Sequence, residues 1–151
     1  MAMLRLEIIT MERKLFDDQV SMVVAPGVDG VLGILPRHAA LMTALDHGEL
    51  KVKQDGQDDQ YFAVSGGFME VQPDHVVVMA DVAEQADEID IERAEAARRR
   101  AEEHVALARR GETSDFSQAE AALRRSILRL KIAGRRRGRR ATAQEPPKPQ
   151  S

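Results

Sequence analysis

The stretch that decides the fold of this chain is Pro26-Gly-Val-Asp-Gly-Val-Leu-Gly-Ile-Leu-Pro-Arg-His-Ala-Ala-Leu-Met-Thr-Ala-Leu45. Its three glycines recur at every third residue, and each permits a backbone turn that a side chain would resist. Ile34 and Leu35 then supply an apolar anchor, and Pro36 ends the strand because proline has no N–H to donate. This pattern is typical of a tight corner in a small β-domain.

The sequence around this corner predicts short strands from the N-terminus to about residue 85. Leu4, Leu6 and Ile8 alternate with charged residues, which is the period of a strand with one buried face. Asp55-Gly56 and Pro73-Asp74 are turn signals between apolar runs. The Gly66-Gly67 pair predicts a further hairpin corner between strands at 61–64 and 67–72. Many short strands with regular turns favour an antiparallel sandwich or barrel.

The hydrophobic period changes near residue 90, where two helices are predicted. Asp90 is suited to cap the first helix, and Arg109, Arg110 and Gly111 suit its end. Apolar residues spaced three or four apart define one stripe on each helix. The stripe of the first helix is Ile91, Ala94, Ala97, Ala101, Val105 and Ala108, and that of the second is Phe116, Ala119, Leu123, Ile127 and Leu130. Since alanine buries little area, this αα-hairpin should be weakly held and able to move.

Charge is distributed unevenly along the 151 residues. Residues 1–89 hold 6 basic and 16 acidic residues, a net charge of −10, whereas residues 134–151 hold 6 basic residues and 1 acidic residue. Such polarity predicts different partners for the two ends. Cysteine is absent, which excludes disulfide and thiol chemistry, and neither a signal peptide nor an apolar run long enough to span a bilayer is present.

Signals for catalysis are poor. The histidines are scattered, without the spacing of metal ligands, and no Gly-x-x-x-x-Gly-Lys loop occurs. A nucleophile elbow around Ser65 would need glycine at position 63, where this chain has alanine. The sequence therefore predicts a chain that is not an enzyme by itself and that holds no metal.

The charged residues of the helices allow two interpretations. Asp90 and Arg93 lie three apart on one helix, and Arg125 and Arg129 lie four apart on the other. Guanidinium groups suit phosphate, and a carboxylate can accept hydrogen bonds from a ribose or a base. A helix cap and a solvated face account for the same residues, and spacing alone favours that interpretation. The basic run 135–140 is likewise interpreted as a solvated tail, because no aromatic residues interleave with it.

Several ordered motifs resemble those of the epsilon subunit of bacterial F-type ATP synthases, the family of chloroplast epsilon and mitochondrial delta. The resemblance covers about residues 3–133. It includes the corner at 29–45, Phe-Ala-Val-Ser-Gly-Gly-Phe-Met-Glu-Val at 62–71, Val-Val-Val-Met-Ala-Asp at 76–81 and Ile-Asp-Ile-Glu-Arg-Ala at 89–94. The last motif matches the Ile/Leu-Asp-x-x-Arg-Ala signature of epsilon subunits that bind nucleotide.

The resemblance implies an α+β fold with three parts. Residues 1–86 would form an antiparallel β-sandwich of ten strands, residues 87–133 an αα-hairpin, and residues 134–151 a disordered tail rich in arginine and proline. It also implies a non-catalytic rotor subunit of the central stalk, on the cytoplasmic face of the bacterial membrane and attached only through the complex. The sandwich would bind the gamma subunit and the c-ring, and the extended hairpin would inhibit ATP hydrolysis by the alpha/beta hexamer.

The resemblance further implies two groups of site residues. ATP would be a regulatory ligand, not a required cofactor, and would clamp the folded hairpin. Its site would be lined by Glu84, Ile89, Asp90, Arg93, Ala94, Arg100, Arg125 and Arg129. Partner contacts would involve His38, Arg124, Arg125, Arg129 and Lys131.

Two departures from the family pattern lie beside His38. Arg37 stands where the family commonly has glycine, and Ala40 where it commonly has proline, so this loop should meet gamma differently. The alternative to a rotor subunit is a stand-alone β-sandwich adaptor, whose basic hairpin would bind an acidic protein or nucleic acid.

Overall fold

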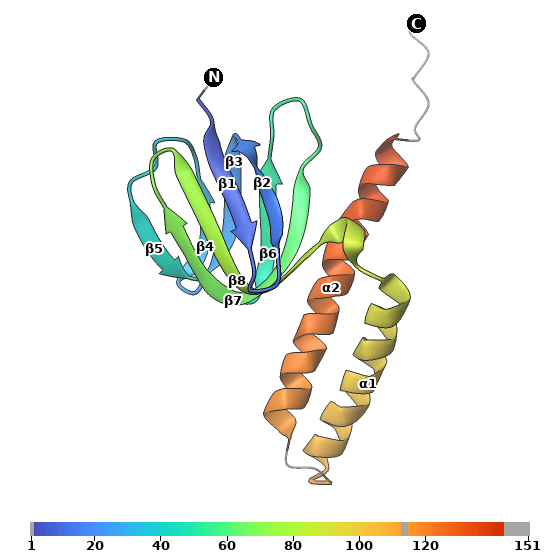
Figure 1. The fold of residues 1–151 in the computed structure, drawn as a ribbon. Helices are drawn as coiled ribbons and strands as arrows, with labels where there is room; N and C mark the ends of the chain where they lie inside the picture. The colour runs from blue at the N-terminus through green and yellow to red at the C-terminus, as the bar shows by residue number, and fades with distance from the viewer. Residues whose placement is uncertain (1, 113–114, 144–151) are drawn as a thin grey trace, which may run out of the picture.

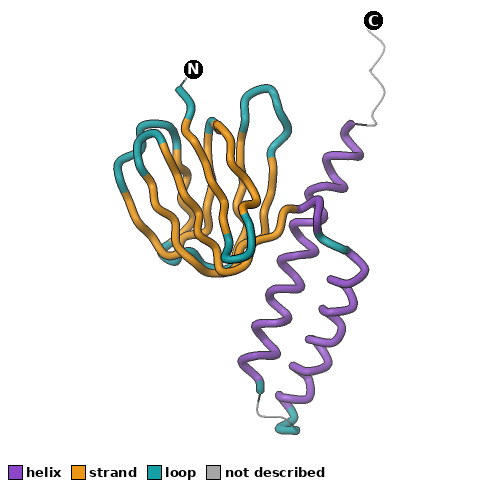
Figure 2. Tube along the Cα trace, viewed as in Figure 1, coloured by secondary structure: helices purple, strands orange, loops and turns teal. Residues whose placement is uncertain are grey.

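The computed structural model describes residues 2–112 and 115–143, with side chains up to residue 135. Strands form a sandwich, and two long helices form a hairpin that extends away from one end of it (Figure 1). In sequence, all the strands come before the helices. Figure 2 shows that the strands and the two long helices also occupy separate parts of the molecule. The elements are β1 (Leu4–Ile9), β2 (Lys14–Val20), β3 (Met22–Gly27), β4 (Gly30–Ile34), β5 (Leu41–Ala44), β6 (Gly48–Lys53), β7 (Gln60–Val71), β8 (His75–Gln85), the 3-10 helix η1 (Ala86–Glu88), α1 (Ile91–Arg109) and α2 (Phe116–Ala143).

The strands pair in the order β2-β1-β8-β7-β6-β3-β4, and β5 also pairs with β7. Every pairing is antiparallel except that of β1 with β8. The fold class predicted from the sequence, a β-sandwich followed by a helical hairpin, is therefore confirmed. The described residues contain eight strands, fewer than the ten that the family resemblance implied.

The core of the sandwich is aliphatic, as the strand period predicts. Leu4, Leu6 and Ile8 are completely or almost completely buried, whereas Arg5 between them is exposed. Phe62 is the largest fully buried side chain, and its ring meets Phe16 edge-on with 6.1 Å between the centroids. Alternation along each strand therefore sends one set of side chains into a common interior.

The Gly66-Gly67 pair is not a hairpin corner, as the sequence predicted, but a bend inside the long strand β7. The residues before the bend pair with β6 and those after it pair with β5, while β8 follows both halves. Gly67 has φ 105°, and a Cβ there would collide with the carbonyl oxygen of Met79. Glycine is needed because the neighbouring strand approaches its backbone closely.

Other turn predictions are confirmed. Gly27 and Gly30 flank the turn between β3 and β4, and β4 ends at Ile34 before Pro36. Gly56 has φ 73° in the turn that leads from β6 to β7. The segment around Pro73 joins β7 to β8.

The helices begin as predicted, but the second one ends later. Asp90 caps α1 by accepting a hydrogen bond of 3.1 Å from the backbone N–H of Arg93. The prediction of disorder from residue 134 is wrong up to Ala143, because α2 continues to that residue. Arginine has high helix propensity, so the basic run can continue a helix that packing has already formed. The rest of the predicted tail, 144–151, lies outside the described residues.

The apolar stripe predicted for the second helix is partly wrong. Ile127 is 51% exposed, whereas Ser126 and Leu128 on either side of it are buried. The reason is that α2 packs against two bodies, α1 and the sandwich, so no single stripe describes its buried surface. The cluster between hairpin and sandwich, here called the junction cluster, consists of Ala63, Ala86, Ile89, Ala94, Leu128, Ile132 and Ala133.

Candidate functional site

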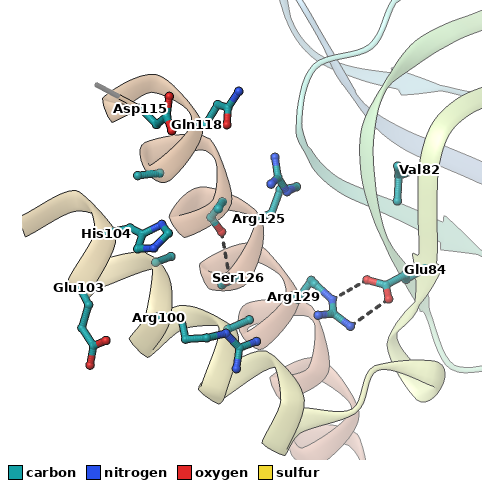
Figure 3. Close-up of a pocket in the computed structure, with 14 residues that line it drawn as sticks. Val82, Glu84, Arg100, Glu103, His104, Asp115, Gln118, Arg125, Ser126 and Arg129 are labelled. Atoms are coloured by element: carbon teal, nitrogen blue, oxygen red, sulfur yellow. Dashed lines mark hydrogen bonds and ion pairs between the residues drawn. The ribbon is translucent and has the colours of Figure 1, made fainter. Parts of the chain in front are cut away.

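The candidate site is a groove of about 930 Å³ between the two helices and the end of β8. Figure 3 shows α1 and α2 on one side of it and the strand that carries Val82 and Glu84 on the other. Its lining residues come from segments far apart in the sequence, which the hairpin turn and the junction cluster bring together. They are Val82, Glu84, Ala97, Arg100, Ala101, Glu103, His104, Asp115, Gln118, Ala119, Ala122, Arg125, Ser126 and Arg129.

An ion pair joins the two walls of this groove. The Nε and Nη2 atoms of Arg129 donate to the two carboxylate oxygens of Glu84 over 2.7 and 3.0 Å (Figure 3). Both side chains are about 30% exposed, at 29% and 31%. A two-pronged pair of this kind fixes direction as well as distance, so it holds the middle of α2 beside the end of β8.

Two further arginines line the groove without such a partner. The guanidinium groups of Arg100 on α1 and Arg125 on α2 form no hydrogen bond or ion pair within the described residues. Arg125 projects from α2 toward the sandwich (Figure 3). Three guanidinium groups thus border one concave surface, an arrangement suited to a ligand with several negative charges.

The structure brings together only half of the residues expected at a nucleotide site. Glu84, Arg100, Arg125 and Arg129 line the groove. The other four lie outside its lining for local reasons. Ile89 and Ala94 are buried in the junction cluster, Asp90 is the cap of α1, and Arg93 is exposed at the start of that helix.

The residues expected to contact partners occupy two regions. Arg124 and Lys131 are exposed on α2, beside the groove residues Arg125 and Arg129. His38 lies in the loop between β4 and β5, where its Nδ1 is 2.8 Å from the carbonyl oxygen of Ala39. One region thus belongs to the sandwich and the other to the hairpin.

The departure at Arg37 has a structural consequence. Arg37 has φ 67°, and it is the only non-glycine residue with positive φ in the described part of the chain. Its backbone N–H donates to the carbonyl oxygen of Pro73 over 2.7 Å. Glycine adopts this conformation without steric cost, so an arginine here adds modest strain to the loop next to His38.

Sequence reasoning missed two contacts between α2 and the sandwich. His47 lies 2.7 Å from the Ser65 hydroxyl through Nδ1 and 3.2 Å from the carbonyl oxygen of Arg124 through Nε2. The guanidinium of Arg135 donates to the carboxylate of Glu49 over 3.1 and 3.3 Å. The partners are 77 and 86 residues apart, and no local pattern encodes such a contact.

The described residues contain neither a metal-binding cluster nor a membrane-spanning helix. No group of three or more His, Cys, Asp or Glu side chains there could hold a metal ion. None of the helices in the described ranges combines the length and apolar character needed to span a bilayer.

Fold and groove together define a two-part protein, a β-sandwich with a helical hairpin docked on it and an arginine-lined groove at their junction. Comparison with known families matches both parts. The ATP synthase delta/epsilon chain beta-sandwich domain matches residues 3–86, and the delta/epsilon chain long alpha-helix domain matches residues 87–134. The chain belongs to the ATP synthase delta/epsilon family, as its motifs predicted.

Curated relatives agree over nearly the whole length. The ATP synthase epsilon chain of Dehalococcoides mccartyi strain BAV1 is 52% identical over 144 residues, which cover 91% of this chain and 96% of the relative. That of Herpetosiphon aurantiacus is 51% identical over 136 residues, covering 90% and 98%. The prediction of a non-catalytic ATP synthase chain agrees with this membership.

A solved structure has the same fold. A chain in the cryo-EM structure of Euglena gracilis mitochondrial ATP synthase, OSCP/F1/c-ring in rotational state 1, superimposes with a TM-score of 0.73. The two are 24% identical, and the match covers 88% of this chain and 82% of the other.

Proposed function

We propose that the chain is a rotor subunit of the central stalk of the F1 sector of a proton-translocating ATP synthase. In this role the sandwich binds gamma and the c-ring and transmits rotation between them. The observation that carries the proposal is family membership through both domains, combined with an apolar surface on the sandwich that suits a permanent partner. Membership favours this function over a stand-alone adaptor.

The apolar surface crosses four adjacent strands of the sandwich. Phe68 on β7 and Met79 on β8 are register partners, 55% and 37% exposed. On the other side of β8, Ile9 of β1 pairs with Met79. On the other side of β7, Met42 of β5 is a diagonal neighbour of Phe68 and is 63% exposed. Grouped apolar side chains on an outer face are typical of protein interfaces. We assign this outer-face stripe to gamma.

The experiment is co-purification of gamma with the full chain carrying Phe68→Glu and Met79→Glu together. Charges in the outer-face stripe should abolish the complex, because burying an unpaired carboxylate is costly. Met11→Glu is the matched control, since Met11 is fully exposed in the turn between β1 and β2. If gamma binds both variants equally, the assignment of this face is wrong.

The hairpin has the second part of the proposed role, inhibition of ATP hydrolysis. Arg124, Arg125 and Lys131 present positive charge on α2, and Ile127 adds an exposed apolar side chain. When the hairpin swings away from the sandwich, this surface would reach the alpha/beta hexamer and block its rotation in the hydrolysis direction. The alanine-rich junction cluster supports such movement because it buries little apolar area.

ATP would act as a regulatory ligand of the groove. Its phosphates would be held by Arg100 and Arg125, with Arg129 shared between the ligand and Glu84. A ligand that contacts both helices and β8 binds only the docked hairpin, so it would stabilise that state by mass action. Under this proposal the chain works at the cytoplasmic face of the membrane and is attached there only through the complex.

A further inference from the structure

We infer that Arg135 acts as a clasp that holds the C-terminal half of α2 against the sandwich and favours the docked hairpin. The inference rests on the proposed movement of the hairpin. Arg135 is the first residue beyond the family's long alpha-helix domain, which matches up to residue 134. The residues of the clasp lie outside the groove lining, so the clasp does not depend on the groove.

The contacts of Arg135 come from two neighbouring strands. Its guanidinium donates from Nε and Nη2 to both carboxylate oxygens of Glu49 on β6, over 3.1 and 3.3 Å. The same group lies over the ring of Tyr61 on β7, with 5.2 Å from the guanidinium carbon to the ring centroid. One side chain thus combines a two-pronged ion pair with a cation–π contact.

The environment of these groups favours the contact. The Glu49 side chain is only 19% exposed, so its carboxylate is partly shielded from water and salt. The Glu49 carboxylate raises the pKa of Arg135, chiefly through the hydrogen bonds and then through charge attraction. Tyr61 packs against the junction cluster and links the clasp to the apolar contact between hairpin and sandwich.

The clasp completes a row of contacts along one face of α2. The row begins where His47 meets the carbonyl oxygen of Arg124 and ends eleven residues later at Arg135, a distance of about 16 Å along the helix. Leu128 and Ile132 lie between these ends and are buried. Since the middle of the row is apolar and short, a strong polar contact at its far end should have a large effect on docking.

Thiol labelling of the full chain tests the clasp, because the sequence contains no cysteine. Ala63 lies on β7 in the junction cluster and is 6% exposed, so the thiol of Ala63→Cys reacts when the hairpin lifts off. The second-site variants Arg135→Gln and Glu49→Gln should each raise its labelling rate about five- to tenfold. Their combination should raise the rate little further, because both remove the same contact.

Two controls distinguish the clasp from a general effect. Arg99→Gln removes an equal charge from an exposed residue of α1 that has no partner within the described ranges, and it should leave the rate unchanged. The thiol of Ala25→Cys, in the sandwich core, reports unfolding of the sandwich and should stay equally protected in Arg135→Gln. Equal rates in Arg135→Gln and Arg99→Gln, or additive effects of Arg135→Gln and Glu49→Gln, would overturn the inference. Since the measurement uses the free chain, it is independent of whether gamma binds.

Discussion

The carboxylate of Glu84 on β8 and the guanidinium of Arg129 on α2 form a two-pronged ion pair, 45 residues apart in sequence, at the edge of the groove. The pair joins the hairpin directly to the sandwich. A phosphate that entered the groove would compete with Glu84 for Arg129 while gaining Arg100 and Arg125. Under the proposed function, ligand binding in the groove would therefore depend on the position of the hairpin.

The first prediction concerns ATP binding. Arg125→Ala should weaken binding about 10- to 100-fold, as expected for the loss of a hydrogen bond between charged groups. Arg93→Ala should have a smaller effect, because Arg93 does not line the groove. Isothermal titration calorimetry measures both, with Arg99→Ala as the control on an exposed part of α1. A larger loss in Arg93→Ala than in Arg125→Ala would contradict this assignment of the site.

The second prediction concerns docking without ligand. Glu84→Gln should raise the labelling rate of the Ala63→Cys thiol about fivefold, because it removes a partly exposed ion pair worth about 1 kcal/mol. The measurement is made without nucleotide, and the sandwich itself should unfold at the same urea concentration as before. An unchanged rate would mean that the Glu84–Arg129 pair does not contribute to docking.

The third prediction concerns inhibition. Deletion from residue 89 onward should raise the rate of ATP hydrolysis of the assembled enzyme and leave assembly intact, because the outer-face stripe lies on the sandwich. Replacing Arg124, Arg125 and Arg129 with alanine should relieve only part of the inhibition, since two of these arginines also line the groove. Hydrolysis is measured at low ATP, where the proposed function expects the hairpin to be swung away from the sandwich. Equal rates with and without the hairpin would refute the inhibitory role.

The fourth prediction concerns acid stability. Hydrogen bonds from Arg5 and Lys14 lower the pKa of Asp17 from 3.8 to about 2, so folding stability gained from this group is complete above pH 3.8 and is lost as the pH falls toward 2. Lys14 and His75 likewise lower the pKa of Glu7 below 4.5. Urea unfolding between pH 2 and 6 should show a shallower loss of stability in Asp17→Asn. Identical pH profiles of stability in Asp17→Asn and the unchanged protein would show that the Asp17 carboxylate does not govern acid unfolding.

The fifth prediction concerns the bend in β7. Gly67→Ala should lower the free energy of unfolding by about 2 kcal/mol or more, because φ 105° and the carbonyl oxygen of Met79 leave no place for a Cβ. Gly134→Ala is the matched control, since no atom lies within 4 Å of a Cβ added there and alanine favours the helix by about 1 kcal/mol. Urea denaturation measures both changes, and equal stability of the two variants would contradict the account of the bend.

The sequence by itself determined the fold class, several turns and the start of the first helix. Alternation at Leu4, Leu6 and Ile8, the glycines of the β3–β4 turn and the cap at Asp90 all act through neighbours within a few residues. Local spacing also placed Arg125 and Arg129 on one face of the second helix, although by itself it favoured a solvated face. Such features are readable because backbone period, turn geometry and capping depend on short stretches of chain.

Only the tertiary structure decided the buried face of α2, the continuity of β7 and the composition of the groove. Ile127 is exposed and Ser126 buried because α2 meets two bodies at once, which no helical period can express. The ion pairs of Glu84 with Arg129 and of Glu49 with Arg135 depend on where the hairpin packs on the sandwich. That position results from summed packing over distant residues, so these contacts follow from the folded chain and not from any segment of it.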